Sequence, residues 1–319
     1  MKKLFLLICL LLPISTILAA CGEENKHADT LTNDENKLTV YTTVYPLQYF
    51  TEEIGGDAIY VETIYPPGSD EHTFDPSQKD MMALADSDLF FYVGLGLEGF
   101  VEKAKDTFKG EDVTMVSTGD KLLTTEAFAQ QPDEGHSKKE TGHSHGDVDP
   151  HIWIDPLYAK EMALSIKEAL IAKLPEKEEE FTKNYEALAE KLDVLNDQFT
   201  EVIDKAKNKE IIVSHAAYGY WESRYGLEQI SVSGLTTSSE PSQKDLENII
   251  KTAKKLGLNY IFFEQNVSSK ITEIVQNEIG AEPLVLHNLS TRTSEDIKNN
   301  RDYFSIMEDN LKALDKGLQ

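Results

Sequence analysis

A long stripe of apolar residues occupies the middle of the chain, between residues 176 and 207. Its members recur at alternating steps of four and three positions: Phe181, Tyr185, Leu188, Leu192, Leu195, Phe199 and Val202. This spacing puts them on one face of an α-helix, and no glycine or proline interrupts the run, so it predicts one rigid helix of roughly 45 Å. The stripe could also form a coiled-coil dimer, but it is shorter than five heptads, so we expect the helix to pack along two lobes and join them.

The segments on either side of this helix follow one plan. The pentapeptide Pro-Ser-Gln-Lys-Asp occurs at residues 76–80 and again at residues 241–245. Each copy opens a helical pattern and lies between two strand-like runs, at 38–42 and 89–93 in the first half and at 210–214 and 260–263 in the second. This repeated order of strands and helices predicts an α/β fold of two similar lobes with mainly parallel sheets.

The remaining periodic segments complete the two lobes. Further strands are predicted at 60–64, 113–116, 230–232 and 284–286. Helices are predicted at 46–54, from about residue 98, and at 157–174, 241–256, 271–279 and 296–318. We therefore expect an N-terminal lobe over residues 38–174, the linking helix over 175–208 and a C-terminal lobe over 209–319.

The N-terminus has the pattern of a secretory signal. Lys2 and Lys3 precede an apolar run that is short for a membrane span and ends in Leu-Ala-Ala before Cys21. A cysteine in this position resembles the lipobox of bacterial lipoproteins, in which it is lipidated. Residues 1–20 are then a signal peptide, and residues 21–37 a polar, disordered tether. Since Cys9 lies in the signal, the mature chain keeps only Cys21, which leaves no internal disulfide and no cysteine-based metal site.

The chain is strongly acidic. It has 56 acidic and 31 basic residues and a formal net charge of −25. This charge argues against binding to nucleic acid and against electrostatic adhesion to anionic lipid. It suits a soluble extracytoplasmic protein that attracts cations weakly.

Three histidines are candidate metal ligands, and two of them, His72 and His215, follow predicted strands, where α/β proteins place their ligands. His72 is in a loop rich in proline and glycine, His151 lies between Pro150 and Trp153, and His215 directly follows a predicted strand. Three neutral imidazoles that meet in a cleft form a zinc-type site, because Zn²⁺ prefers nitrogen and sulfur donors. Each histidine taken alone could equally be a hydrogen-bonding loop residue, and the spacing leaves open whether the three converge.

Four motifs occur in order around the long helix, behind the lipobox: Glu71-His72 with Asp75-Pro76-Ser77, Asp149-Pro150-His151-Ile152-Trp153, Ser214-His215-Ala216-Ala217-Tyr218-Gly219-Tyr220 and Phe262-Phe263-Glu264. With them the chain resembles the zinc- and manganese-uptake solute-binding lipoproteins of bacterial ABC importers (cluster A-I). The resemblance implies two α/β lobes joined by a rigid helix, with the metal in the cleft between them. It also implies an importer membrane permease as partner and an extracytoplasmic location, anchored to the cell membrane by lipidated Cys21. We expect a monomer.

The same resemblance implies that His72, His151 and His215 are metal ligands. Manganese members carry a carboxylate at the third position, so His215 favours Zn²⁺, and manganese uptake is the alternative. Many relatives supply a fourth ligand, Asp or Glu, just beyond the last strand of the C-terminal lobe. In this chain that position is Ser290, a poor zinc ligand, which leaves water, Glu71 or His287 to complete the shell. In the polar segment 130–149, three histidines resemble the His-rich loop of zinc-specific members, although a plain solvated loop would look the same: His136, His143 and His145.

Two other functional classes remain. Three histidines and a water also form a catalytic zinc site, for which Glu71 and Glu264 are candidate bases, but no H-E-x-x-H motif is present. A surface adhesin would use the lipid anchor but would leave the histidines without a role. We therefore predict a zinc-binding transport protein and no enzyme.

Overall fold

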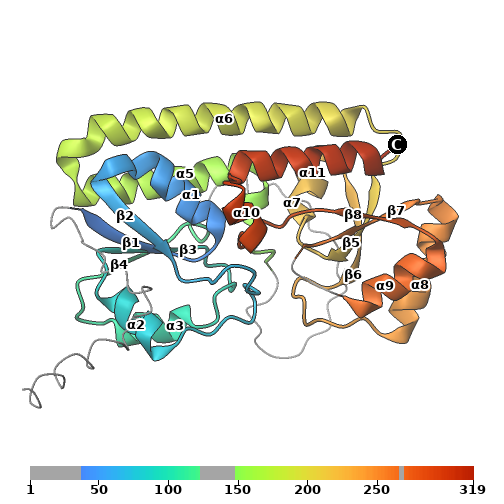
Figure 1. Ribbon diagram of the computed structural model, residues 1–319, viewed down its shortest axis with the longest axis horizontal. Helices are drawn as coiled ribbons and strands as arrows, with labels where there is room; N and C mark the ends of the chain where they lie inside the picture. The colour runs from blue at the N-terminus through green and yellow to red at the C-terminus, as the bar shows by residue number, and fades with distance from the viewer. Residues whose placement is uncertain (1–36, 123–147, 266–268) are drawn as a thin grey trace, which may run out of the picture. The chain divides into compact units, whose positions relative to one another are not determined.

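The computed structural model describes residues 37–122, 148–265 and 269–319, which contain two four-stranded parallel sheets. The first has the order β2-β1-β3-β4 and the second β6-β5-β7-β8 (Figure 1), so the two halves share one strand order. The first sheet consists of β1 (Leu38–Thr42), β2 (Ile59–Thr63), β3 (Leu89–Tyr92) and β4 (Thr114–Ser117). The second consists of β5 (Glu210–His215), β6 (Glu228–Ser233), β7 (Tyr260–Phe263) and β8 (Glu282–Val285). The predicted fold class, two similar α/β lobes with parallel sheets, is confirmed.

Helices connect these strands and follow the last one. They are α1 (Tyr45–Gly55), α2 (Gln78–Ala85), α3 (Val101–Thr107), α5 (Pro156–Lys173), α6 (Glu178–Asp204), α7 (Gly219–Tyr225), α8 (Gln243–Leu256), α9 (Lys270–Ile279), α10 (Ser294–Lys298) and α11 (Tyr303–Gly317). In the described ranges, no helix is both long and apolar enough to cross a lipid bilayer. The predicted signal peptide, the tether with Cys21, and His136, His143 and His145 lie outside the described residues.

The prediction of one helix over residues 296–318 is wrong, because the chain breaks there into α10 and α11. Asn300 adopts a left-handed conformation with a φ of 51°, which asparagine tolerates better than most residues. Asp302 then caps α11, since its side chain accepts the N–H of Ser305 at 2.8 Å. Both features end the first helix and start the second.

The repeated pentapeptide has a local structural role in both halves. Ser77 caps α2 and forms a capping box with Asp80, and Ser242 and Asp245 do the same for α8. In each box the serine accepts a backbone N–H of the first turn while the aspartate accepts the backbone N–H of the serine. The repeat therefore starts equivalent helices in the two halves.

The predicted linking helix is α6, an unbroken helix of 27 residues. Its apolar stripe is buried against elements from both halves of the chain, since α6 contacts α1 and α5 as well as α7 and α11 (Figure 1). The stripe is thus covered by the chain itself, where a coiled-coil dimer would need it free. Two members of the predicted stripe, Tyr185 and Val202, are only partly buried, and Ile203, which was not predicted, is buried at its end. The boundaries of the lobes around α6 stay predictions.

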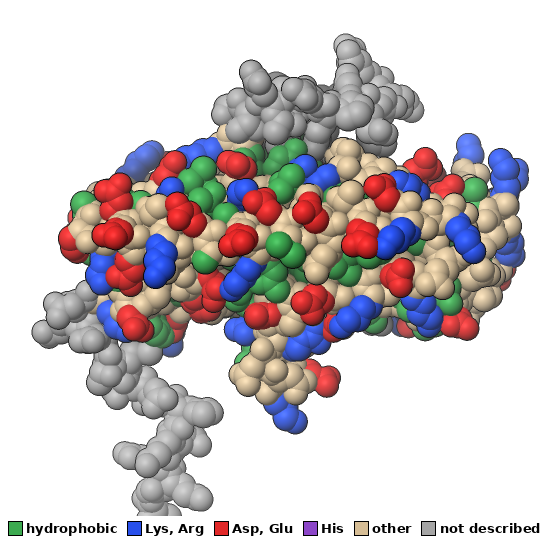
Figure 2. Space-filling model, turned by 90° about the horizontal axis from the view of Figure 1, so that it is seen from above, with side chains coloured by type: hydrophobic (Ala, Val, Ile, Leu, Met, Phe, Trp, Pro, Cys, Tyr) green, Lys and Arg blue, Asp and Glu red, His purple; other side chains and the backbone are tan. Residues whose placement is uncertain are grey.

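The outer side of α6 is charged. Acidic and basic side chains are interspersed across the face seen in Figure 2, with no large area of one sign. Lys160 bonds to Asp193 at 2.7 Å, and Lys191 lies 3.3 Å from Glu53. Ion pairs this exposed contribute little to stability. The free energy that fixes α6 comes instead from its buried stripe.

A pair of substitutions in α6 tests this conclusion. Leu192 is fully buried, so Leu192→Ala is expected to lower the free energy of unfolding by about 2–5 kcal/mol through lost contacts and a cavity. Val194 lies two positions away and is 52% exposed, so Val194→Ala should change it by less than about 0.5 kcal/mol. Urea denaturation followed by circular dichroism measures both values. Equal losses in the two variants would show that the stripe does not carry the packing.

Candidate metal centre

Three histidines from separate segments meet in one place. His72 lies in the loop between β2 and α2, His151 directly precedes a short 3-10 turn, and His215 is the last residue of β5. Turns formed by nearby aspartates shape two of these segments. Asp70 Oδ1 accepts the backbone N–H of His72 at 2.8 Å, and Asp149 Oδ1 accepts that of His151 at 2.9 Å.

The Nε2 atoms of the three rings converge. His151 Nε2 lies 3.2 Å from His72 Nε2 and 3.1 Å from His215 Nε2. The three potential ligand atoms all lie within 4.8 Å of one another. A zinc ion held about 2.0–2.1 Å from each nitrogen in tetrahedral order would separate these nitrogens by roughly 3.3 Å. The structure therefore brings together all three histidines that the sequence singled out, and the distances from His151 to the other two are close to those around one tetrahedral ion.

Two carboxylates fix the orientation of two of these rings. His151 Nδ1 bonds to Asp149 Oδ1 at 2.7 Å, and His215 Nδ1 bonds to Glu264 Oε1. Since an ionised carboxylate can only accept, Nδ1 carries the proton in both pairs and Nε2 is the atom left for a metal. Carboxylate–imidazole pairs of this kind orient the histidine ligands of zinc sites. Glu264, a candidate catalytic base in the sequence, is thus engaged in holding His215.

Burial and neighbouring charges shift two of the histidine pKa values in opposite directions. Burial, followed by the nearness of His151 and His215, lowers the pKa of His72 from its usual 6.5 to about 3. Burial also acts to lower the pKa of His215, but the charge and the hydrogen bond of Glu264 outweigh it and raise that pKa above its usual value. A proton therefore competes with a metal ion for His215, and hardly at all for His72.

Glu71 lies next to the three histidines, but Ser290 is engaged elsewhere. Glu71 Oε1 is 3.9 Å from His72 Nε2, and burial raises the pKa of this carboxyl. The hydroxyl of Ser290 donates to Asn288 Oδ1 at 3.0 Å. Glu71 is therefore better placed than Ser290 to complete a metal shell.

His287 is poorly suited to be a further ligand. Its Nδ1 accepts the backbone N–H of Leu289 at 2.9 Å, so the proton of the neutral ring is on Nε2, which faces Asp296 at 3.4 Å. A metal needs a nitrogen with a free lone pair, and both nitrogens of this ring are engaged. His287 is also not part of the cluster of three histidines.

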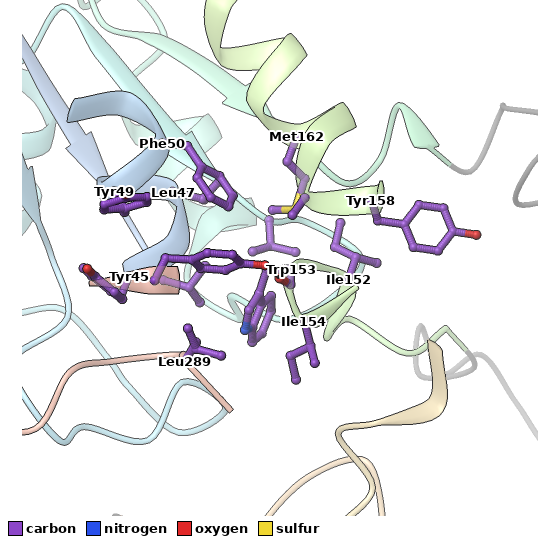
Figure 3. Close-up of a cluster of buried hydrophobic side chains, with 14 of the residues drawn as sticks. Tyr45, Leu47, Tyr49, Phe50, Ile152, Trp153, Ile154, Tyr158, Met162 and Leu289 are labelled. Atoms are coloured by element: carbon purple, nitrogen blue, oxygen red, sulfur yellow. Dashed lines mark hydrogen bonds between the residues drawn. The ribbon is translucent and has the colours of Figure 1, made fainter. Parts of the chain in front are cut away.

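Side chains from the second half of the chain hold the segment that carries His151. The hydroxyl of Tyr220 donates to the carbonyl oxygen of Asp149, and that of Tyr303 donates to the carbonyl of Trp153 at 3.0 Å. Trp153 in turn donates its indole N–H to the carbonyl of Asn288 at 2.6 Å. Figure 3 shows Trp153 in a packed apolar cluster that includes Tyr45, Phe50, Ile152, Ile154 and Leu289. His151 is therefore fixed with respect to both sheets.

Two functional neighbours were missed or undervalued in the sequence. In the sequence Asp149 stands out only as part of a motif, although its place two residues before His151 is the signal for the bond that it makes. Asn288 has no sequence signal at all, because its side-chain partners Glu71 and Glu264 lie 217 and 24 residues away.

Comparison with known proteins agrees with this geometry. The family described as "Zinc-uptake complex component A periplasmic" matches residues 40–317. The zinc-binding lipoprotein AdcA of Streptococcus pneumoniae is 37% identical over 315 residues, which are 98% of this chain and 60% of AdcA. The chain thus spans less than two thirds of the length of that relative.

Solved structures are similar over the same region. The crystal structure of the Zn(II)-bound ZnuA-like domain of Streptococcus pneumoniae AdcA has a TM-score of 0.73 and 35% identity, covering 88% of this chain and 99% of that domain. The laminin-binding protein Lmb of Streptococcus agalactiae, described as bifunctional with adhesin and metal-transporting activity, has a TM-score of 0.75 and 27% identity, covering 89% and 100%. Since the family matches most of the chain and the described fold agrees, this chain belongs to the ZnuA family, the periplasmic component A of zinc-uptake complexes.

Proposed function

We propose that this protein captures Zn²⁺ outside the cytoplasm and delivers it to an ABC importer, and that His72, His151 and His215 are its ligands. The observation that carries the proposal is the convergence of the three Nε2 atoms, with neighbouring pairs 3.1 and 3.2 Å apart. Two of these rings are oriented by carboxylates on their far nitrogens. The name of the AdcA relative and the Zn(II)-bound domain structure support zinc as the ion.

The donor set favours zinc over manganese. Imidazole nitrogens suit Zn²⁺, whereas Mn²⁺ prefers oxygen ligands. Glu71 is the carboxylate that we favour for the fourth position, since Oε1 lies 3.9 Å from His72 Nε2, and a water is the alternative. Manganese uptake by the same site stays the second candidate within the family, and competition between the two ions in a binding assay would decide between them.

The partner and the anchor follow from the family and the sequence. A component of an uptake complex passes its ion to the membrane permease of the importer, which is the partner we propose. We also propose that lipidated Cys21 holds the protein at the outer side of the cell membrane, as the name of the AdcA lipoprotein supports. A monomer agrees with the burial of the α6 stripe within the chain.

Hydrolysis and adhesion are the competing functions. Both candidate bases are engaged, Glu264 with His215 and Asn288, and Glu71 with Asn288. This arrangement favours binding over catalysis, and turnover of ester or peptide substrates by the zinc-loaded protein would contradict it. Adhesion is suggested by the similar Lmb structure, and a laminin-binding assay with intact cells tests it.

The main test replaces a ligand and a matched histidine. His215→Ala removes one of three nitrogen donors and is expected to weaken zinc binding by more than about 100-fold, because loss of a ligand's supporting partner alone costs 10–100-fold. His287→Ala removes a histidine that is similarly buried but lies outside the cluster, and should leave the affinity unchanged. Competition with a chelator of known affinity measures both. Full affinity in the His215→Ala variant would remove this residue from the site.

The raised pKa of His215 predicts how zinc binding depends on pH. A protonated His215 cannot bind a metal, so affinity is complete above this pKa and falls by about tenfold per pH unit below it. His72 should add nothing to this slope above pH 5, because its pKa is about 3. Chelator competition between pH 5 and 8, together with calorimetry in buffers of different ionisation enthalpy, would show the proton that zinc displaces. An affinity that is flat over this range would indicate a carboxylate site instead.

A further inference from the structure

The side-chain amide of Asn288 joins two carboxylates that come from opposite halves of the chain. Asn288 Nδ2 donates to Glu71 Oε1 at 3.0 Å and to Glu264 Oε2 at 3.1 Å. Glu71 lies in the loop between β2 and α2, Glu264 directly follows β7, and Asn288 lies just beyond β8. All three residues are buried. One NH₂ group therefore serves two acceptors next to the histidine cluster.

The orientation of this amide is determined by Ser290. Asn288 Oδ1 accepts both the backbone N–H and the hydroxyl of Ser290, each at 3.0 Å. Since a carbonyl oxygen cannot donate, Oδ1 has to face Ser290 and the NH₂ group has to face the carboxylates. The two donors and both acceptor positions of the side chain are thus used, and turning the amide over would break all four bonds.

The backbone of Asn288 is fixed as well. Its carbonyl oxygen accepts the indole N–H of Trp153, two residues after His151, at 2.6 Å. Asn288 is therefore bonded to three places around the site. Its backbone binds the segment that presents His151, and its side chain binds Glu71 and Glu264, the neighbours of His72 and His215.

Both carboxylates that Asn288 binds act on the histidines. Glu264 uses one oxygen for His215 Nδ1 and the other for Asn288, so neither of its oxygens is free to turn away. In Glu71, Oε1 accepts the hydrogen bond from Asn288, and this same oxygen lies 3.9 Å from His72 Nε2. Without the amide, two buried carboxylates would lose a shared donor, and a buried acceptor left without its partner is costly. We expect Glu71 and Glu264 then to adopt other rotamers.

We propose that Asn288 is a positioning residue of the metal centre, which acts through Glu264 and Glu71 to fix the geometry in which zinc is held. Ser290, which stands where the family resemblance places an anionic ligand, orients Asn288 instead of binding the metal. This inference rests on the proposed function, and it adds a residue that acts on the histidines through the two carboxylates.

The test compares Asn288 with an asparagine elsewhere. Asn288→Ala and the bulkier Asn288→Leu both remove the amide, and we expect zinc affinity to fall by about 10–100-fold in each. Asn184→Ala is the control, since Asn184 in α6 also donates through Nδ2, to the carbonyl of Ile54 at 3.0 Å, and should keep full affinity. Ser290→Ala should cause a smaller loss in the same direction. Circular dichroism and thermal melting verify that each variant folds.

A spectroscopic measurement separates positioning from a general loss of stability. Co²⁺ bound in place of Zn²⁺ has visible absorption bands whose position and intensity depend on the ligand geometry. We expect these bands to change in Asn288→Ala and Asn288→Leu and to stay as in the parent protein in Asn184→Ala. An unchanged cobalt spectrum and unchanged zinc affinity in folded Asn288 variants would overturn the proposal.

A double-mutant cycle tests the route through Glu71. If Asn288 acts through this carboxylate, the loss in Asn288→Ala combined with Glu71→Ala should be smaller than the sum of the two single losses. Strict additivity would overturn that route. Failure of this inference is distinguishable from failure of the proposed function, because His215→Ala would still abolish tight zinc binding in the first case and would retain it in the second.

Discussion

The hydrogen bonds that the Nδ1 atoms of His151 and His215 donate to carboxylates determine which atoms of the two rings can bind a metal. With both Nδ1 protons donated outward, the Nε2 atoms of the two rings point toward one another at 3.1 Å. Two lone pairs at that distance repel unless a positive charge lies between them, and only a proton or a metal ion is small enough. A proton on His215, whose pKa is raised by the charge and the hydrogen bond of Glu264, is one such charge, and a divalent ion is the other. The arrangement of the two nitrogens therefore favours a bound cation, and it is set by bonds on the far side of each ring.

The same bonds explain why the site needs both halves of the chain. His215 is the last residue of β5 in the second sheet and Glu264 directly follows β7, whereas His72 lies in a loop of the first half. His151 lies in a segment of the first half that Tyr220 and Tyr303 of the second half hold. α6 covers elements of both halves without a break, so it limits how far the sheets can move relative to one another. Local changes in the loops around the histidines are then the natural response to an ion.

Much of the fold was predictable because it depends on local periodicity and on capping. The stripe of α6 and the capping boxes of Ser77 and Ser242 are visible in short windows of sequence. The break between α10 and α11 was missed, because a left-handed asparagine and an aspartate cap look like ordinary polar residues of a helical surface. The three histidines were found through motifs that resemble a family, and the structure brought them together. Asn288 could not be found in this way, since its bond to Glu71 spans 217 positions.

The two tryptophans of the chain have a consequence for how the protein can be observed. Both are fully buried, and both indole N–H groups bond within the network around His151: Trp153 to the carbonyl of Asn288, and Trp221 to the carbonyl of Ile154. The ring of Trp153 also lies 5.4 Å from that of His151. Since the chain has no other tryptophan, its intrinsic indole fluorescence originates entirely from two side chains that bond within this network. The unlabelled protein thus carries its own optical reporter of the segment that presents His151, and a solution experiment can follow events there without any added probe.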